Sequence, residues 1–143
     1  MNKQVPDVTR NYVVLIADDD DAIRNAMRRT LRRGGYAVVE VRNGRDALAL
    51  LNKKLPVDLL IADLQMPHVG GYEMARRGRL MRPDLKVLYV SGCVDRLFES
   101  RSQLWKNEAF LEKPFTRQDL LSAAALLLRG RGDAVCESAA SDT

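Results

Sequence analysis

Hydrophobic residues along the chain gather in short runs that alternate with segments of helical periodicity. Five apolar runs have the length and the β-branched content of buried strands, at residues 12–17, 36–41, 57–62, 85–90 and 109–111. Apolar positions spaced three and four apart predict helices at 22–34, after Asn43, at 72–81, at 94–105 and after Thr116. Five alternations of strand and helix predict a doubly wound α/β fold, with a parallel sheet covered by helices on both faces.

The third apolar run ends on an acid. Val57 to Ala62 is apolar except at Asp58, Asp63 follows it, and Pro67 prevents the strand from continuing. Asp63 is therefore expected at the carboxyl end of a central strand, where open α/β sheets bind their ligands. The alternative is that Asp63 only caps a turn, because aspartate is common at turns.

Other predicted strands also end on polar side chains suited to phosphate chemistry. These are Asp18 and Asp19 after the first strand, Ser91 after the fourth and Lys113 after the fifth. The carboxyl ends of parallel strands converge on one rim, where clustered carboxylates repel one another and favour a divalent cation such as Mg²⁺. There Asp63 could attack phosphorus to form an acyl phosphate, while the Lys113 ammonium neutralises charge on the transferred group.

These residues carry a resemblance to a known family. Asp18-Asp19, Asp63 with Met66-Pro67, Ser91-Gly92 and Lys113-Pro114-Phe115 together resemble the receiver domains of two-component response regulators. Each motif is common alone, but all four in order, each after an apolar run, make a specific pattern over residues 12–129. The resemblance implies a flavodoxin-like (βα)5 fold with strand order 2-1-3-4-5. The short sequence segments around Ser91 and Lys113 are most similar to those of receivers in hybrid sensor kinases.

The resemblance also implies a role for each site residue. Asp63 would be the phospho-acceptor and Lys113 would hold the phosphoryl group. The Mg²⁺ ion would be bound directly by Asp19 and Asp63, through water by Asp18, and by the backbone carbonyl of Gln65. Ser91 and Phe110 would act as the switch residues that report phosphorylation to an output face at about 94–129.

Further expectations concern partners. The phosphoryl donor would be a histidine kinase or a histidine phosphotransfer protein, and the output would be an unknown downstream protein or the draining of phosphate from a relay. We expect a monomer or a weak homodimer that is not a turnover enzyme. Arginines 24, 28, 29, 32 and 33 lie on the first helix, which helps to dock the donor in the family. A solvated helix face explains these arginines slightly better than an acidic partner does.

The composition of the chain is that of a globular protein. The 143 residues carry a net charge of +4, with 46% hydrophobic and 29% charged residues, which suits one globular domain. We expect an N-terminal extension over 1–11, a receiver domain over 12–129 and a disordered, small and polar tail over 130–143. No apolar run approaches the ~18 residues of a membrane span, and Cys93 and Cys136 fit no zinc pattern. We therefore expect a cytoplasmic protein that does not bind a membrane. We also expect no direct binding of nucleic acid, because the basic residues are scattered.

Two other functional classes fit parts of the sequence. An aspartyl phosphatase would need Asp-x-Asp followed closely by Thr or Val after the first strand, whereas Ala22 and Ile23 follow the acidic run here. A phosphate-independent scaffold with the same fold would not need Asp19, Asp63, Ser91 and Lys113 to be present together. Both readings are therefore less favoured than a phosphorylation-gated module.

Overall fold

The protein has a central five-stranded parallel sheet in the order β2-β1-β3-β4-β5, as seen in a computed structural model that describes residues 11–53, 55–66, 69–92 and 107–129. The strands are β1 (Val13–Ala17), β2 (Ala37–Val41), β3 (Leu59–Asp63), β4 (Lys86–Ser91) and β5 (Glu108–Glu112). The helices are α2 (Asp21–Arg33), α3 (Gly44–Asn52), α4 (Gly71–Met81) and α6 (Arg117–Arg129). This confirms the predicted fold class and strand order.

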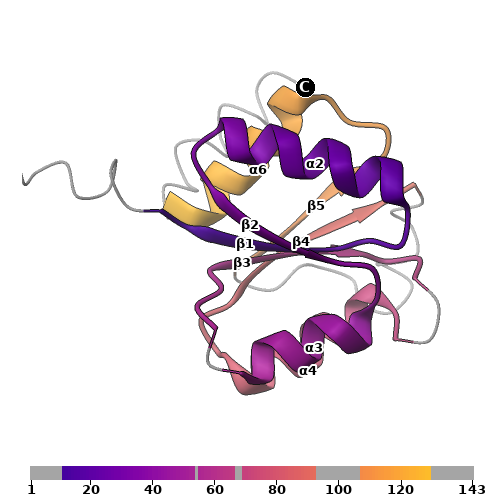
Figure 1. Cartoon of the computed structure of the whole chain (residues 1–143), viewed down its shortest axis with the longest axis vertical. Coiled ribbons are helices and arrows are strands. Elements are labelled where there is room, and N and C mark those ends of the chain that lie inside the picture. Colours follow the sequence, from indigo (N-terminus) through magenta and orange to yellow (C-terminus); the bar gives the residue numbers. More distant parts are fainter. Residues whose placement is uncertain (1–10, 54, 67–68, 93–106, 130–143) are drawn as a thin grey trace, which may run out of the picture.

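Helices cover both faces of the sheet. Figure 1 shows α2 and α6 on one side of the strands and α3 and α4 on the other. Alternate residues of β1 serve the two cores: Val14 and Ile16 pack with α2 and α6, whereas Leu15 and Ala17 pack with α3 and α4. Every residue of β3 is buried. An apolar strand covered on both faces is what the hydrophobic run before Asp63 predicted.

The strand order creates the position for a site. The chain passes from β1 to β2 on one side, and then crosses to β3 on the other side of β1. The pairing places Ala17 beside Ala62, Asp63 beside Val90, and Ser91 beside Glu112. The carboxyl ends of four strands therefore meet at one rim, next to the point where the order reverses, which is where such sheets form ligand crevices.

Polar side chains fix the starts of three helices, and the sequence predicted two of these starts, after Asn43 and after Thr116. The Asp20 carboxylate accepts a hydrogen bond from the Ile23 amide at the start of α2, and Asn43 caps α3 through the Asp46 amide. At α6 the Thr116 hydroxyl accepts from the Asp119 amide, and the Asp119 carboxylate accepts from the Thr116 amide. These bonds satisfy backbone donors that have no partner within the helix.

Some expectations lie outside the described residues. They are the helix expected at 94–105, most of the N-terminal extension and the tail from 130. The fifth strand is longer than expected, because it begins at Glu108, whose buried carboxylate accepts a hydrogen bond from Tyr89 and pairs with Arg79. None of the helices among the described residues has the length and hydropathy of a membrane span.

Candidate functional site

Three carboxylates form an acidic cluster at the carboxyl rim of the sheet. One oxygen each from Asp18, Asp19 and Asp63 lies within 4.8 Å of the other two. Asp18 and Asp63 are buried, at 0% and 3% exposure, whereas Asp19 is exposed to solvent. Buried carboxylates this close need a compensating positive charge. Oxygen donors of this kind suit a hard cation such as Mg²⁺, so the residues present fit the metal that the resemblance implies.

Asp63 ends β3, and both described contacts of its carboxylate involve Oδ1. This oxygen accepts a hydrogen bond from the Gln65 amide at 3.0 Å, and Lys113 Nζ lies 3.6 Å from it. The Gln65 side chain itself is exposed. The turn after β3 thus holds the Asp63 carboxylate through a backbone donor.

A glycine at the start of α4 lets the helix approach Asp63. A Cβ atom on Gly71 would lie 2.3 Å from the Asp63 carbonyl oxygen and 2.8 Å from its carbonyl carbon. Real Cβ atoms essentially never come that close to other heavy atoms. Only glycine therefore allows this packing of α4 against the turn that carries Asp63.

Asp18 is the most enclosed acid of the cluster. Its Oδ1 accepts a hydrogen bond from the Asp20 amide at 2.9 Å, and Lys113 Nζ lies 3.4 Å from its Oδ2. Burial raises the pKa of the Asp18 carboxyl, against the lowering effect of the Asp20 amide, and the charge of Asp63 raises this pKa further. The site therefore disfavours a full set of negative charges in the absence of a cation.

Lys113 contacts both buried carboxylates of the acidic cluster. It follows β5, and its side chain, which is 19% exposed, reaches to Asp18 and Asp63. Its backbone amide donates to the Ser91 carbonyl at 2.8 Å, so the ends of β4 and β5 are tied together. The structure thus brings together the acid, hydroxyl and ammonium residues that the sequence places far apart.

The two expected switch residues differ in exposure. Ser91, the last residue of β4, is buried, at 1% exposure. Phe110 lies on β5 beside Tyr89 in the strand register, and it is 38% exposed. The described position of the Phe110 ring is therefore partly open to solvent.

Two arginines of α2, Arg24 and Arg28, bind groups of the protein itself, although the sequence favoured a solvated face for them. Arg24 is buried, at 9% exposure, and its guanidinium binds the Asp18 carbonyl, Asp21 and Glu40. Arg28 also binds Glu40. The solvated reading is wrong for these two residues, because Glu40 of β2 faces them, whereas arginines 29, 32 and 33 are exposed. The charge of Glu40 within a β-branched strand was the sequence signal for this pairing.

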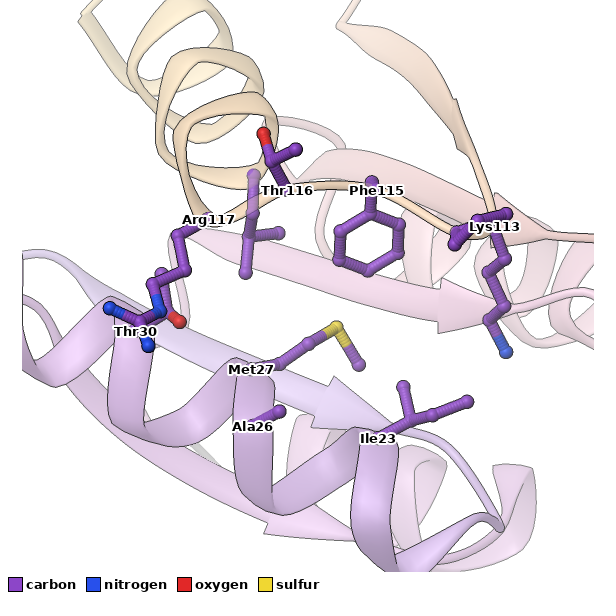
Figure 2. Close-up of a pocket in the computed structure, with 10 residues that line it drawn as sticks. Ile23, Ala26, Met27, Thr30, Lys113, Phe115, Thr116 and Arg117 are labelled. Carbon is purple, nitrogen blue, oxygen red and sulfur yellow. The ribbon is translucent and has the colours of Figure 1, made fainter.

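An apolar groove of about 460 Å³ lies beside the acidic cluster, between α2 and the segment leading into α6. Its walls include Ile23, Met27, Phe115 and Leu120, with Lys113 also in the lining. Figure 2 shows the Phe115 ring facing Met27 of α2, with Lys113 at one end of the groove. A partner seated here would lie next to the amine that contacts Asp63.

Comparisons with known proteins agree with this geometry. Residues 14–125 match the family described as response regulator receiver domain. The response regulator receiver protein CpdR of Brucella abortus is 32% identical over 80% of this chain and 95% of its own length. The sensor kinase CckA of the same species is 30% identical over 88% of this chain, which spans only 13% of that kinase.

The solved structures that are similar to this chain include receiver proteins. A response regulator receiver protein from Sinorhizobium medicae superposes with a TM-score of 0.77 at 28% identity, covering 85% of this chain and 98% of its own. The chemotaxis protein CheY4 of Vibrio cholerae has a TM-score of 0.74 at 28% identity, covering 83% and 100%. Both fold and sequence are therefore similar to those of receivers.

Proposed function

The chain belongs to the response regulator receiver family, whose general function is to accept a phosphoryl group, and on that premise we propose that Asp63 is the acceptor. One observation carries the proposal. Lys113 Nζ lies 3.6 Å from Asp63 Oδ1, in a cluster where oxygens of Asp18, Asp19 and Asp63 approach within 4.8 Å. A buried nucleophilic carboxylate beside one ammonium and two further acids is suited to phosphoryl transfer.

In the proposed reaction, an oxygen of Asp63 attacks the phosphorus of a phosphohistidine. A P–O bond forms as the P–N bond breaks, and the imidazole leaves with its electron pair. Lys113 neutralises charge on the phosphoryl oxygens. Ser91, buried at the end of β4, donates a hydrogen bond to the same group, and Phe110 follows its movement.

The proposal includes Mg²⁺ as the cofactor. Asp19 and Asp63 would bind it directly, Asp18 through water, and Gln65 through its backbone carbonyl. When bound, the ion would supply positive charge to the transferred phosphoryl oxygens. The support for this assignment is the acidic cluster and the raised pKa of Asp18, which results mainly from burial and is increased by the charge of Asp63.

The proposed donor is a histidine kinase or a histidine phosphotransfer protein. The apolar groove beside Lys113 supports this choice. Its lining includes Ile23 and Leu120, and a helix docked there would lie next to Lys113, which contacts Asp63. The response would be binding of a downstream protein or drainage of phosphate from a relay. The receiver unit would work in the cytoplasm as a monomer or weak homodimer and would not act as a turnover enzyme.

The proposed domain division is a receiver over 12–129, flanked by an extension and a tail. The match to CpdR, which covers 95% of that receiver protein, supports one receiver unit over these residues. The coverage of CckA and of the response regulator MprA of Mycolicibacterium vanbaalenii is only 13% and 50%. Those two relatives support the receiver unit alone.

Labelling by a small phosphodonor tests the acceptor. The wild-type protein incubated with phosphoramidate and Mg²⁺ is expected to gain one phosphoryl group that base and hydroxylamine remove, and Asp63→Asn is expected to lack it. Asp20→Asn is the matched control, because asparagine caps a helix as well as aspartate does and Asp20 caps α2 beside the cluster. Undiminished labelling of Asp63→Asn would contradict the assignment.

A further inference from the structure

The guanidinium of Arg24 connects the turn after β1 to β2. Its Nη1 donates to the Asp18 carbonyl at 2.8 Å, its Nη2 to Asp21 at 2.5 Å, and its Nε to Glu40 at 2.9 Å. These contacts use both ends of the planar fork, and the side chain is 10% exposed. A lysine could not reproduce them, because it offers one point of charge on a flexible stem.

The Asp18 carbonyl, which accepts a hydrogen bond from Arg24, belongs to a residue of the acidic cluster. The carbonyl of Asp18 belongs to the planar peptide that joins Asp18 to Asp19, two of the three acids in the cluster. The Asp18 amide on its other side donates to the Val41 carbonyl at 3.3 Å. Arg24 therefore fixes the peptide from which the exposed side chain of Asp19 extends.

Arg24 belongs to a network of ion pairs beside the acidic cluster. Arg24, Arg28 and Arg42 carry three positive charges, and they pair with the two negative charges of Asp21 and Glu40. A positive charge near an acidic cluster would by itself weaken the binding of a cation. Glu40, which binds Arg24 and Arg28, offsets part of that charge and holds the Arg24 fork in place, so the two possible effects of Arg24, charge and geometry, can be separated by experiment.

We propose that Arg24 is a positioning residue for the cation site, with Glu40 of β2 as its anchor. Arg24 orients the Asp18–Asp19 peptide so that both carboxylates face the position of the ion, without touching the ion itself. This inference depends on the proposed function, because it assumes that the acidic cluster binds Mg²⁺. Groups that orient metal ligands typically change metal affinity by 10- to 100-fold when they are removed.

Replacement of Arg24 by methionine gives a test in which the two effects have opposite signs. If Arg24 acts only through its charge, its loss removes repulsion and Mg²⁺ binds more tightly. If Arg24 positions the peptide, Arg24→Met weakens Mg²⁺ binding by about tenfold. Arg24→Lys, which keeps the charge, is expected to weaken binding in the same direction.

The measurement is the dissociation constant of MgCl₂ for the full chain, followed by backbone amide shifts in ¹⁵N-labelled protein. Arg28→Met is the matched control, because Arg28 also pairs with Glu40 but has no described bond to Asp18. It is expected to change the dissociation constant by less than twofold. Circular dichroism establishes that each variant is folded, and Arg24→Lys carries the test if Arg24→Met has lost the fold.

The outcomes separate this inference from the proposed function. Weaker binding in both Arg24 variants, with the Arg28 variant unchanged, supports the positioning role. Unchanged or tighter binding in the folded Arg24 variants would overturn it, and so would an equal loss in the Arg28 variant. A wild-type protein that fails to bind Mg²⁺ would contradict the proposed cation site, and this inference with it.

Discussion

Replacing Gly71 with alanine tests the close packing of α4 against the turn that carries Asp63. The added Cβ atom would lie 2.3 Å from the Asp63 carbonyl oxygen and 3.0 Å from the Leu64 Cα atom. Ordinary van der Waals contact begins at 3.4 Å. The start of α4 or the Asp63 turn must therefore shift by roughly 1 Å, because both atoms belong to the backbone and cannot rotate away.

The expected cost follows from two opposing terms. Alanine is favoured over glycine in a helix by at most about 1 kcal/mol. Overpacking of a buried contact typically costs about 1–3 kcal/mol, and here the contact is with backbone. We therefore expect a net loss of about 1–2 kcal/mol in the free energy of unfolding, together with slower phosphorylation because Asp63 moves.

Urea denaturation followed by circular dichroism measures this change. Gly78→Ala is the matched control in the same helix, where the added Cβ atom would meet only the side-chain ends of Leu51 at 3.0 Å and Leu85 at 3.3 Å. Those side chains can rotate, so this variant is expected to lie within about 1 kcal/mol of the wild type. A Gly71→Ala protein as stable as the Gly78→Ala protein would refute the packing argument.

Three other predictions concern stability. In the folded, metal-free protein the pKa of Asp18 is raised above its ordinary value of 3.8, so the folded state keeps this proton to higher pH than the unfolded state does. The free energy of unfolding should therefore fall as the pH rises through the raised pKa. Urea titrations with EDTA should show this fall in the wild type and not in Asp18→Asn. Glu108→Ala leaves the Arg79 charge without its buried partner and should cost about 3 kcal/mol, whereas Glu112→Ala, at an exposed site on the same strand, should cost far less in the same assay. A Glu108→Ala loss no greater than that of Glu112→Ala would contradict the importance of the pair. Thr116→Ala removes the cap of α6 and should lower the unfolding free energy by about 1 kcal/mol, with Thr116→Ser close to the wild type.

Much of the fold was predictable because parallel strands leave a strong pattern. A strand buried on both faces must be apolar along its length, and β3 follows this rule at every residue before Asp63. The rim was predictable for the same reason. Once five parallel strands alternate with helices, their carboxyl ends must converge, so Asp18, Asp63 and Lys113 were expected at one edge.

Features that depend on strand register were harder to predict. Glu108 lies outside the strand expected at 109–111, yet Tyr89 and Arg79 bind its carboxylate and let it begin β5 within the sheet. Arg24 read as part of a solvated face because its partner Glu40 is distant in sequence. The close approach of Gly71 to Asp63 depends on how α4 packs, which local sequence patterns do not encode.

Amide spectra recorded with beryllofluoride and Mg²⁺, which together mimic a phosphorylated carboxylate, test the central claim most directly. In ¹⁵N-labelled protein we expect large shifts at Asp63, Ser91 and Lys113, and no such shifts in Asp63→Asn. An unchanged wild-type spectrum at saturating ligand would contradict a phosphoryl site at this rim and favour a scaffold that ignores phosphate.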